Sequence, residues 1–176
     1  PSELLMAQRQ ADVSGSCAVC VIEGSRPIIA EIQALTSPTV YPSPRRMSAG
    51  IDYNRLSLLL AVLEKRLGLK YSTQDVYLAG GLRLDEPSAD MSSALALIST
   101  LRDLPVREDL IAFGEIGLSG ECRAVTGIDI RISESRRLGF KKIAIPYRAM
   151  NKLKANTEGV EIIPIRSVFD LLKLLA

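Results

Sequence analysis

Two stretches near the start of the chain, residues 16–23 and 28–35, are mostly apolar and are separated by a short polar connection. Apolar runs of this length are typical of strands, and the connection that contains Gly24 and Pro27 suits a tight turn. The pattern predicts an antiparallel hairpin. Three prolines follow between residues 37 and 46. Because proline disrupts both helices and central strands, we expect an exposed loop there.

Helical spacing dominates the next part of the chain. Between residues 52 and 67 five leucines recur three or four positions apart, and Gly68 follows as a natural stop. Residues 76–79 form a short apolar run that is typical of a strand. Residues 89–101 are rich in helix-forming side chains and follow Pro87, a residue favoured at helix starts. The sequence therefore predicts helix, strand and helix in this order.

The second half alternates between short apolar runs and helical stretches. A turn sequence at residues 118–120 predicts a second hairpin between residues 111–114 and 121–125. Further expected elements are a helix at 127–138, strands at 142–145 and 160–163 with a helix-like segment between them, and a helix at 167–175. The whole pattern predicts an α/β (α+β) fold, with a β-hairpin region at the N-terminal end and strand-helix alternation later.

Composition fits one globular domain, because 47% of the 176 residues are apolar and 24% are charged. The net charge of +2 is too small to indicate nucleic-acid binding by itself. Neither a transmembrane stretch nor a signal peptide is visible, so we expect a cytoplasmic protein without a membrane partner. Cys17, Cys20 and Cys122 are expected to be free thiols. No metal site is expected, because the chain has no histidine to complete four ligands.

Several phrases of the sequence resemble one known family in their order and spacing. They are residues 26–35 (Arg-Pro-Ile-Ile-Ala-Glu-Ile-Gln-Ala-Leu), 52–55 (Asp-Tyr-Asn-Arg), 63–66 (Leu-Glu-Lys-Arg), 84–87 (Leu-Asp-Glu-Pro), 114–121 (Gly-Glu-Ile-Gly-Leu-Ser-Gly-Glu) and 138–140 (Leu-Gly-Phe). From about Ser14 onward, the chain resembles the C-terminal, Lon-protease-like domain of the RadA (Sms) family of bacterial DNA repair proteins. The resemblance implies a Lon proteolytic-domain-like fold for residues 14–176. It also implies that residues 1–13 are a linker from an ATPase domain that this sequence lacks.

The resemblance also implies a position for the peptidase site of Lon-type enzymes, in which a lysine activates a serine in a Pro-Ser-Ala-Gly phrase. The matching phrase is residues 87–90, so Ser88 is present but Asp90 replaces the glycine. The lysine position is assigned to Asp129, and Arg131 nearby cannot act as a base. A degenerate site without catalytic residues is therefore expected, in which Ser88 only starts a helix. An active Ser-Lys peptidase remains the alternative.

Other family properties concern partners and cofactors. The resemblance implies a homo-oligomer in the form of a hexameric ring, joined in cis to an N-terminal ATPase domain. ATP, Mg and Zn are expected for the full-length protein, whereas no cofactor is expected within these 176 residues. A Gly-x-x-x-x-Gly-Lys-Ser/Thr phrase, which cradles phosphates in many ATPases, does not occur in the sequence.

One segment is markedly basic. Residues 41–70 hold six basic and two acidic side chains, a net charge of +4, which leaves −2 for the rest. Together with the resemblance, this asymmetry predicts contacts to DNA, most simply to single strands. The candidate residues are Arg45, Arg46, Arg55, Lys65 and Arg66, with Tyr41 and Tyr53 as possible stacking partners and Arg83 as a weaker candidate. An ordinary solvated face, or a pure oligomerisation scaffold, is the alternative.

Overall fold

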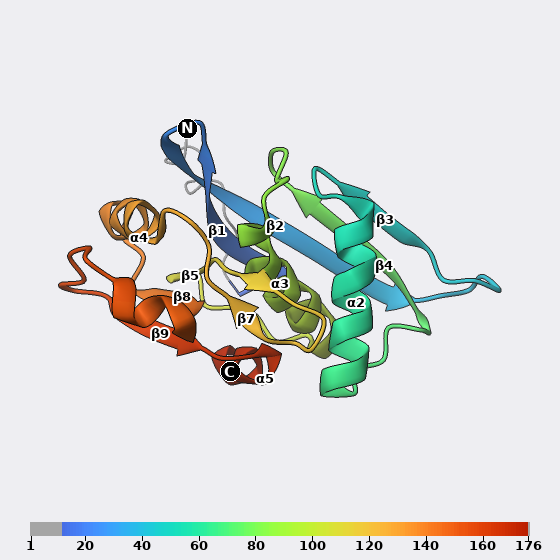
Figure 1. The fold of residues 1–176 in the computed structure, drawn as a ribbon. Coiled ribbons are helices and arrows are strands. Elements are labelled where there is room, and N and C mark those ends of the chain that lie inside the picture. Colours follow the sequence, from blue (N-terminus) through green and yellow to red (C-terminus); the bar gives the residue numbers. More distant parts are fainter. Residues whose placement is uncertain (1–11, 176) are drawn as a thin grey trace.

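A seven-stranded mixed sheet forms the centre of the computed structural model, which describes residues 12–175 (Figure 1). The strand order across the sheet is β3-β4-β2-β1-β5-β8-β9. These strands are β1 (Ser16–Glu23), β2 (Arg26–Pro38), β3 (Arg46–Ala49), β4 (Gln74–Gly80), β5 (Leu110–Ala112), β8 (Lys142–Pro146) and β9 (Glu161–Ile165). β1 and β2 pair antiparallel, which confirms the predicted first hairpin. β5, β8 and β9 run parallel to β1 and to one another, as expected for strand-helix alternation.

The helices begin and end close to the predicted positions. They are α2 (Tyr53–Leu67), α3 (Asp90–Arg102), α4 (Ile128–Arg137) and α5 (Val168–Leu171), with the 3₁₀ turns η1 (Pro87–Ala89), η2 (Tyr147–Lys152) and η3 (Leu172–Leu174). At the start of α2, the Asp52 carboxylate accepts the Arg55 backbone N–H at 3.2 Å. At its end, Gly68 adopts a left-handed conformation with a φ of 68°. Both are standard helix caps, so the sequence was sufficient to predict where α2 begins and ends.

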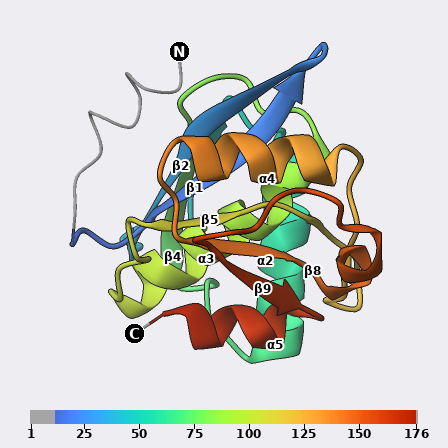
Figure 2. The same ribbon diagram turned by 90° about the vertical axis from the view of Figure 1, so that its left-hand side faces the viewer.

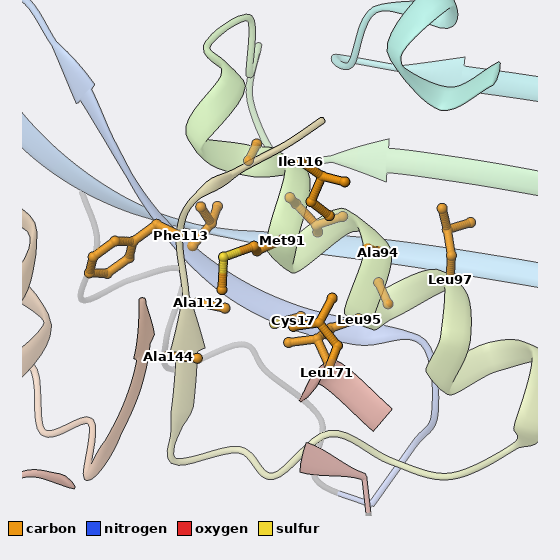
Figure 3. Close-up of a cluster of buried hydrophobic side chains, with 14 of the residues drawn as sticks. Cys17, Met91, Ala94, Leu95, Leu97, Ala112, Phe113, Ile116, Ala144 and Leu171 are labelled. Carbon is orange, nitrogen blue, oxygen red and sulfur yellow. The ribbon is translucent and has the colours of Figure 1, made fainter. Parts of the chain in front are cut away.

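The core lies between α3 and one face of the sheet. Every residue of α3 from Asp90 to Ser99 is buried, which explains why its apolar residues show no single stripe. Figure 3 shows side chains of α3, including Met91 and Leu95, packed with Cys17 of β1 and Leu171 of α5. Because α3 is enclosed on all sides, the loop before it is held in a fixed position. That loop carries Ser88.

The other face of the sheet is only partly covered. α4 packs against β1 and β2, as Figure 2 shows, and both faces of β1 are consequently buried from Cys17 to Cys20. Further along, Leu35 and Met47 lie beside Tyr77 in the strand register, and both are more than half exposed. α4 therefore shields only the part of the sheet next to the hairpin turn.

The second hairpin differs from the prediction. Residues 110–112 form the central strand β5 instead of a hairpin arm, with β1 on one side and β8 on the other. The hairpin consists of two shorter strands, β6 (Glu115–Ile116) and β7 (Cys122–Arg123). A fully apolar run suits a strand buried on both faces, and periodicity alone does not distinguish this case from a hairpin arm.

Smaller differences concern edges and ends. The expected proline-rich loop is confirmed for residues 39–45, but Arg46 already belongs to β3, an unpredicted edge strand. The expected final helix is α5 followed by η3. The predicted linker at residues 1–13 lies almost wholly outside the described residues. Among the helices of the described part, none combines the length and the apolar character needed to cross a membrane.

Candidate functional site

Ser88 lies in η1, directly before α3, and its side chain is fully buried. The Gly114 backbone N–H donates to the Ser88 carbonyl at 2.9 Å, and the Gly114 carbonyl accepts the Met91 N–H at 3.1 Å. A Cβ at Gly114 would clash with the Met91 sulfur and with Pro146, so only glycine allows this approach. The segment after β5 therefore fixes the backbone that presents Ser88.

The Ser88 hydroxyl donates a hydrogen bond to Glu86 Oε1. The Nη1 of Arg131, on α4, donates to the same oxygen atom and also to the Cys20 carbonyl at 2.8 Å. Its Nε donates to the Thr126 carbonyl at 3.0 Å, and only 3% of the Arg131 side chain is exposed. We call Ser88, Glu86 and Arg131 the Ser88 cluster. Glu86 was not among the site residues predicted from the sequence, although it lies two residues before Ser88.

Asp129 does not lie in this cluster, which corrects the position assigned from the sequence. Its Oδ1 accepts the backbone N–H groups of Lys154 and Ala155, both at 2.9 Å. Residues two apart on a helix point about 200° apart around its axis, so Asp129 and Arg131 face opposite sides of α4. The side chain that reaches the surroundings of Ser88 is Arg131.

A pocket of about 250 Å³ lies in front of Ser88. The residues that line it are Glu86, Pro87, Ser88, Glu115, Ala124, Val125, Thr126 and Arg131, and none of them is a lysine. A serine hydroxyl needs a neighbouring base to become a nucleophile. A guanidinium does not give up its proton in proteins, and a carboxylate is a far weaker base than a desolvated amine. The geometry thus provides a buried hydrogen-bonded cluster and no lysine base.

Asp90 forms a second buried cluster at the start of α3. Its carboxylate accepts the Ile116 backbone N–H at 3.0 Å and the Arg55 Nε at 3.2 Å, with a further bond from Arg55 Nη2. Burial raises the pKa of Asp90 to about 6, although Arg55 and the Ile116 N–H act in the opposite direction. Asp90 therefore connects α2, α3 and β6 at the position where the Lon-type phrase has glycine.

The basic candidates do not form one surface. Arg55 is bound to Asp90, and Arg46 donates to the backbone carbonyls of Gln74 and of Tyr71, the latter at 2.9 Å. Both arginines are only partly exposed, and their guanidinium groups bond to other residues of the same chain. Arg45 is exposed at the loop, with its guanidinium carbon 4.1 Å from the centre of the Tyr41 ring.

The remaining candidates lie elsewhere. Lys65 and Arg66 are exposed in the last turn of α2, whereas Tyr53 is half exposed at the opposite end of the same helix. Arg83, the weaker candidate, pairs with Asp85 at 2.7 Å. Basic residues that are close in the sequence thus lie at opposite ends of the 15-residue helix α2: Arg55 is in its first turn, and Lys65 and Arg66 are in its last turn.

The three cysteines are buried thiols. Cys17 and Cys20 lie in β1, within the apolar stretch that was predicted to be a strand, and Cys122 lies in β7. Burial raises the pKa of Cys20 and of Cys122 to about 12, so neither side chain forms a thiolate near neutral pH. They pack as small apolar residues.

Most of the chain matches a known protein family. Residues 65–175 match the family described as Lon protease (S16) C-terminal proteolytic domain. The match includes the Ser88 cluster, Asp90, α3 and the strands β5 to β9, whereas Arg55, the partner of Asp90, lies before it.

Similar proteins extend this result to nearly the whole chain. A protein of Synechocystis sp. named DNA repair protein RadA is 45% identical over 171 residues, which cover 96% of this chain and 33% of the relative. The protein of that name from Bacillus subtilis is 45% identical over 175 residues, covering 98% and 38%. That from Streptococcus pyogenes serotype M3 is 43% identical over 175 residues with the same coverage. The chain spans little more than a third of the length of these relatives.

Proposed function

The chain belongs to the family of Lon protease C-terminal proteolytic domains, in the form that is similar to RadA proteins, and from this premise we propose a non-peptidase function. We propose that the domain contacts DNA and supports assembly within a DNA repair protein. The observation that carries the non-peptidase part of the proposal is the Ser88 cluster. In this cluster, the buried guanidinium of Arg131 binds Glu86, which is also the hydrogen-bond partner of the potential nucleophile Ser88.

The contacts of Arg131 support a structural role for this cluster. Arg131 links α4 to a carbonyl of β1 and to the loop before α3. Such a link fixes three separate elements, and its loss would leave Glu86 without its cationic partner. Ser88 itself is tied to Glu86 and does not point freely into the pocket. The Ser88 cluster therefore has a structural role, and its pocket offers no lysine to remove the proton of the Ser88 hydroxyl.

DNA contact is proposed on the exposed basic side chains. Arg45 at the loop, with Lys65 and Arg66 at the end of α2, are free of the main-chain bonds that occupy Arg46. Exposed cations bind phosphate through the release of condensed counterions, which makes binding steeply salt-dependent and nearly independent of sequence. The relatives are named DNA repair proteins, and contact with DNA would agree with those names.

Assembly is the third part of the proposal. We propose a hexameric homo-oligomer attached to an ATPase domain in cis, with ATP, Mg and Zn used by that domain in the full-length protein. Head-to-tail contacts between copies close into rings when the rotation allows. Light scattering at micromolar concentration should detect an oligomer of this chain, and a monomer as the sole species would contradict this part.

Peptidase activity is tested by two measurements. Casein and fluorogenic peptides should remain intact with the purified chain, and Ser88→Ala should give the same result. A fluorophosphonate probe, which labels activated serines, should not label Ser88 above the background set by the exposed Ser119. Ser119→Ala serves as the matched control for that background. Cleavage that disappears in Ser88→Ala, or selective labelling of Ser88, would overturn the proposal.

A further inference from the structure

We infer that one DNA-contacting surface of the chain is a composite surface at the end of α2, completed by residues far away in the sequence. This inference rests on the proposed function and specifies its site and ligand. The composite surface consists of Lys65, Arg66, Leu118, Tyr147, Arg166 and Phe169. Its ligand is single-stranded DNA, with phosphates held by the cations and bases stacked on the aromatic rings.

The turn between β6 and β7 joins the two halves of this surface. The Val168 N–H donates to the Gly120 carbonyl at 2.9 Å, so α5 is anchored to the turn. A Cβ at Gly120 would lie 3.1 Å from a methyl carbon of Val168 and 3.2 Å from Cγ of Arg66. The stem of Arg66 and the start of α5 therefore meet at this glycine. Figures 1 and 2 both show α5 beside the C-terminal end of α2.

Aromatic and apolar side chains are exposed around this junction. Phe169 is 55% exposed, Leu118 is 70% exposed and Tyr147 is 44% exposed. The Arg166 guanidinium carbon lies 3.8 Å from the centre of the Tyr147 ring, and the Arg166 carbonyl accepts the Cys122 N–H at 3.0 Å. An arginine stacked on an aromatic ring keeps its edge groups free for phosphate, and it presents a flat surface to a base.

Two acidic residues close to this surface, Glu121 and Asp170, are already engaged. The Glu121 carboxylate accepts bonds from Ser119 and Arg123, which lower its pKa to about 2. The Asp170 carboxylate accepts the Arg166 backbone N–H at 2.8 Å and lies 3.5 Å from Lys173 Nζ. These contacts offset the two negative charges. The side chains of Lys65, Arg66 and Arg166 remain as a positive excess that complements a phosphate backbone.

The exposed rings favour single strands over duplex DNA. Within a duplex the faces of the bases are stacked on each other, so a protein ring cannot stack on them without unpairing the helix. In a single strand every base has an accessible face, and stacking on an aromatic side chain tolerates any sequence. Exposed Phe169 directly follows Val168, which meets the stem of Arg66 at Gly120, and it supplies an apolar stacking platform for that ligand.

Binding of a fluorescein-labelled oligo-dT to the folded chain, followed by anisotropy at several salt concentrations, tests this surface. Phe169→Ala should weaken binding roughly ten-fold, while Phe169→Tyr should bind like the parent because the ring is retained. Arg166→Gln should weaken binding and reduce the steepness of the log-log salt dependence by about 0.7. Arg26→Gln, an exposed arginine at the β1–β2 turn on the opposite side of the molecule, should leave both unchanged.

The outcomes separate this inference from the proposed function. If the parent binds oligo-dT but Phe169→Ala and Arg166→Gln bind equally well, the composite surface is wrong while DNA contact stands. If the parent binds neither single-stranded nor duplex DNA, the proposed function fails and the inference fails with it. Tighter binding of a duplex of equal length would also overturn the inference. Unchanged melting temperatures of the variants would exclude unfolding as the cause of weaker binding.

Discussion

Two groups of arginines in this molecule show opposite arrangements. Arg131 and Arg46 direct their guanidinium groups into the chain, where they bind backbone carbonyls and, for Arg131, the Glu86 carboxylate. Arg66 and Arg166 are exposed at the surface, and Arg166 is stacked on the half-exposed ring of Tyr147. The first group holds elements of the fold together. The second is available to a ligand.

The comparison shows why charge counted along a sequence is a poor guide to a binding surface. Of the two neighbouring arginines, Arg45 is exposed, whereas Arg46 bonds to the backbone carbonyls of Tyr71 and of Gln74 at the start of β4. An arginine with several internal partners loses its value as a phosphate ligand, because binding would break those bonds. The following predictions test how sharply the two groups differ.

The largest effect is expected for Arg131→Met. The substitution leaves the Glu86 carboxylate without its ion-pair partner and two carbonyls without their donor, so the free energy of unfolding should fall by about 3 kcal/mol. Urea denaturation at pH 7 measures this loss. Arg26→Met, at the exposed hairpin turn, should change stability by less than about 0.5 kcal/mol. A loss below about 1 kcal/mol for Arg131→Met would show that the Ser88 cluster does not stabilise the fold.

The next effect concerns the pH dependence due to Asp90. Because its folded pKa is raised to about 6, above the unfolded value of about 4, the protonated carboxyl favours the folded state. That contribution is complete below about pH 4 and is lost as the pH rises through about 6. Its size is about 2 to 3 kcal/mol. Relative to Asp90→Asn, the parent should therefore lose stability between about pH 4 and about pH 6.

NMR of the carboxyl carbon of Asp90 measures the same titration directly. A midpoint near pH 6 is expected. A midpoint below about 4 would mean that the ion pair with Arg55 outweighs burial, and the sign of the stability change would then reverse. In that case the Asp90 cluster would resemble the Arg131 contacts, in which the ion pair stabilises the charged form.

The smallest effect distinguishes two neighbours in the sequence. Arg46→Gln should lower the free energy of unfolding by about 1 kcal/mol, because a shorter neutral side chain cannot reach the carbonyls of Tyr71 and Gln74. Arg45→Gln should change it by less than about 0.5 kcal/mol. Thermal unfolding of the two variants provides the comparison. Equal stabilities would remove the distinction between internal and surface arginines at this edge of the sheet.

The sequence predicted the elements whose structure depends only on residues within one short segment. The first hairpin, α2 with its caps at Asp52 and Gly68, and the strands β8 and β9 follow from periodicity and turn residues alone. The resemblance of the sequence phrases to the RadA family agrees with the matching family and with the similar proteins. The position of Ser88 at the start of a helix was also predictable from Pro87.

Only the tertiary structure decided which residues meet. The second hairpin was placed on the wrong strand because a short buried run looks the same whether it pairs locally or with distant strands. Arg131 was passed over in favour of Asp129, because a shift of two residues along a helix turns a side chain to the opposite face. The composite surface joins α2 and α5 through Gly120, which lies beside Arg66 and Val168, and this long-range contact has no local signal in the sequence. A sequence pattern records the preferences of neighbouring residues, whereas these contacts depend on how the separate elements pack.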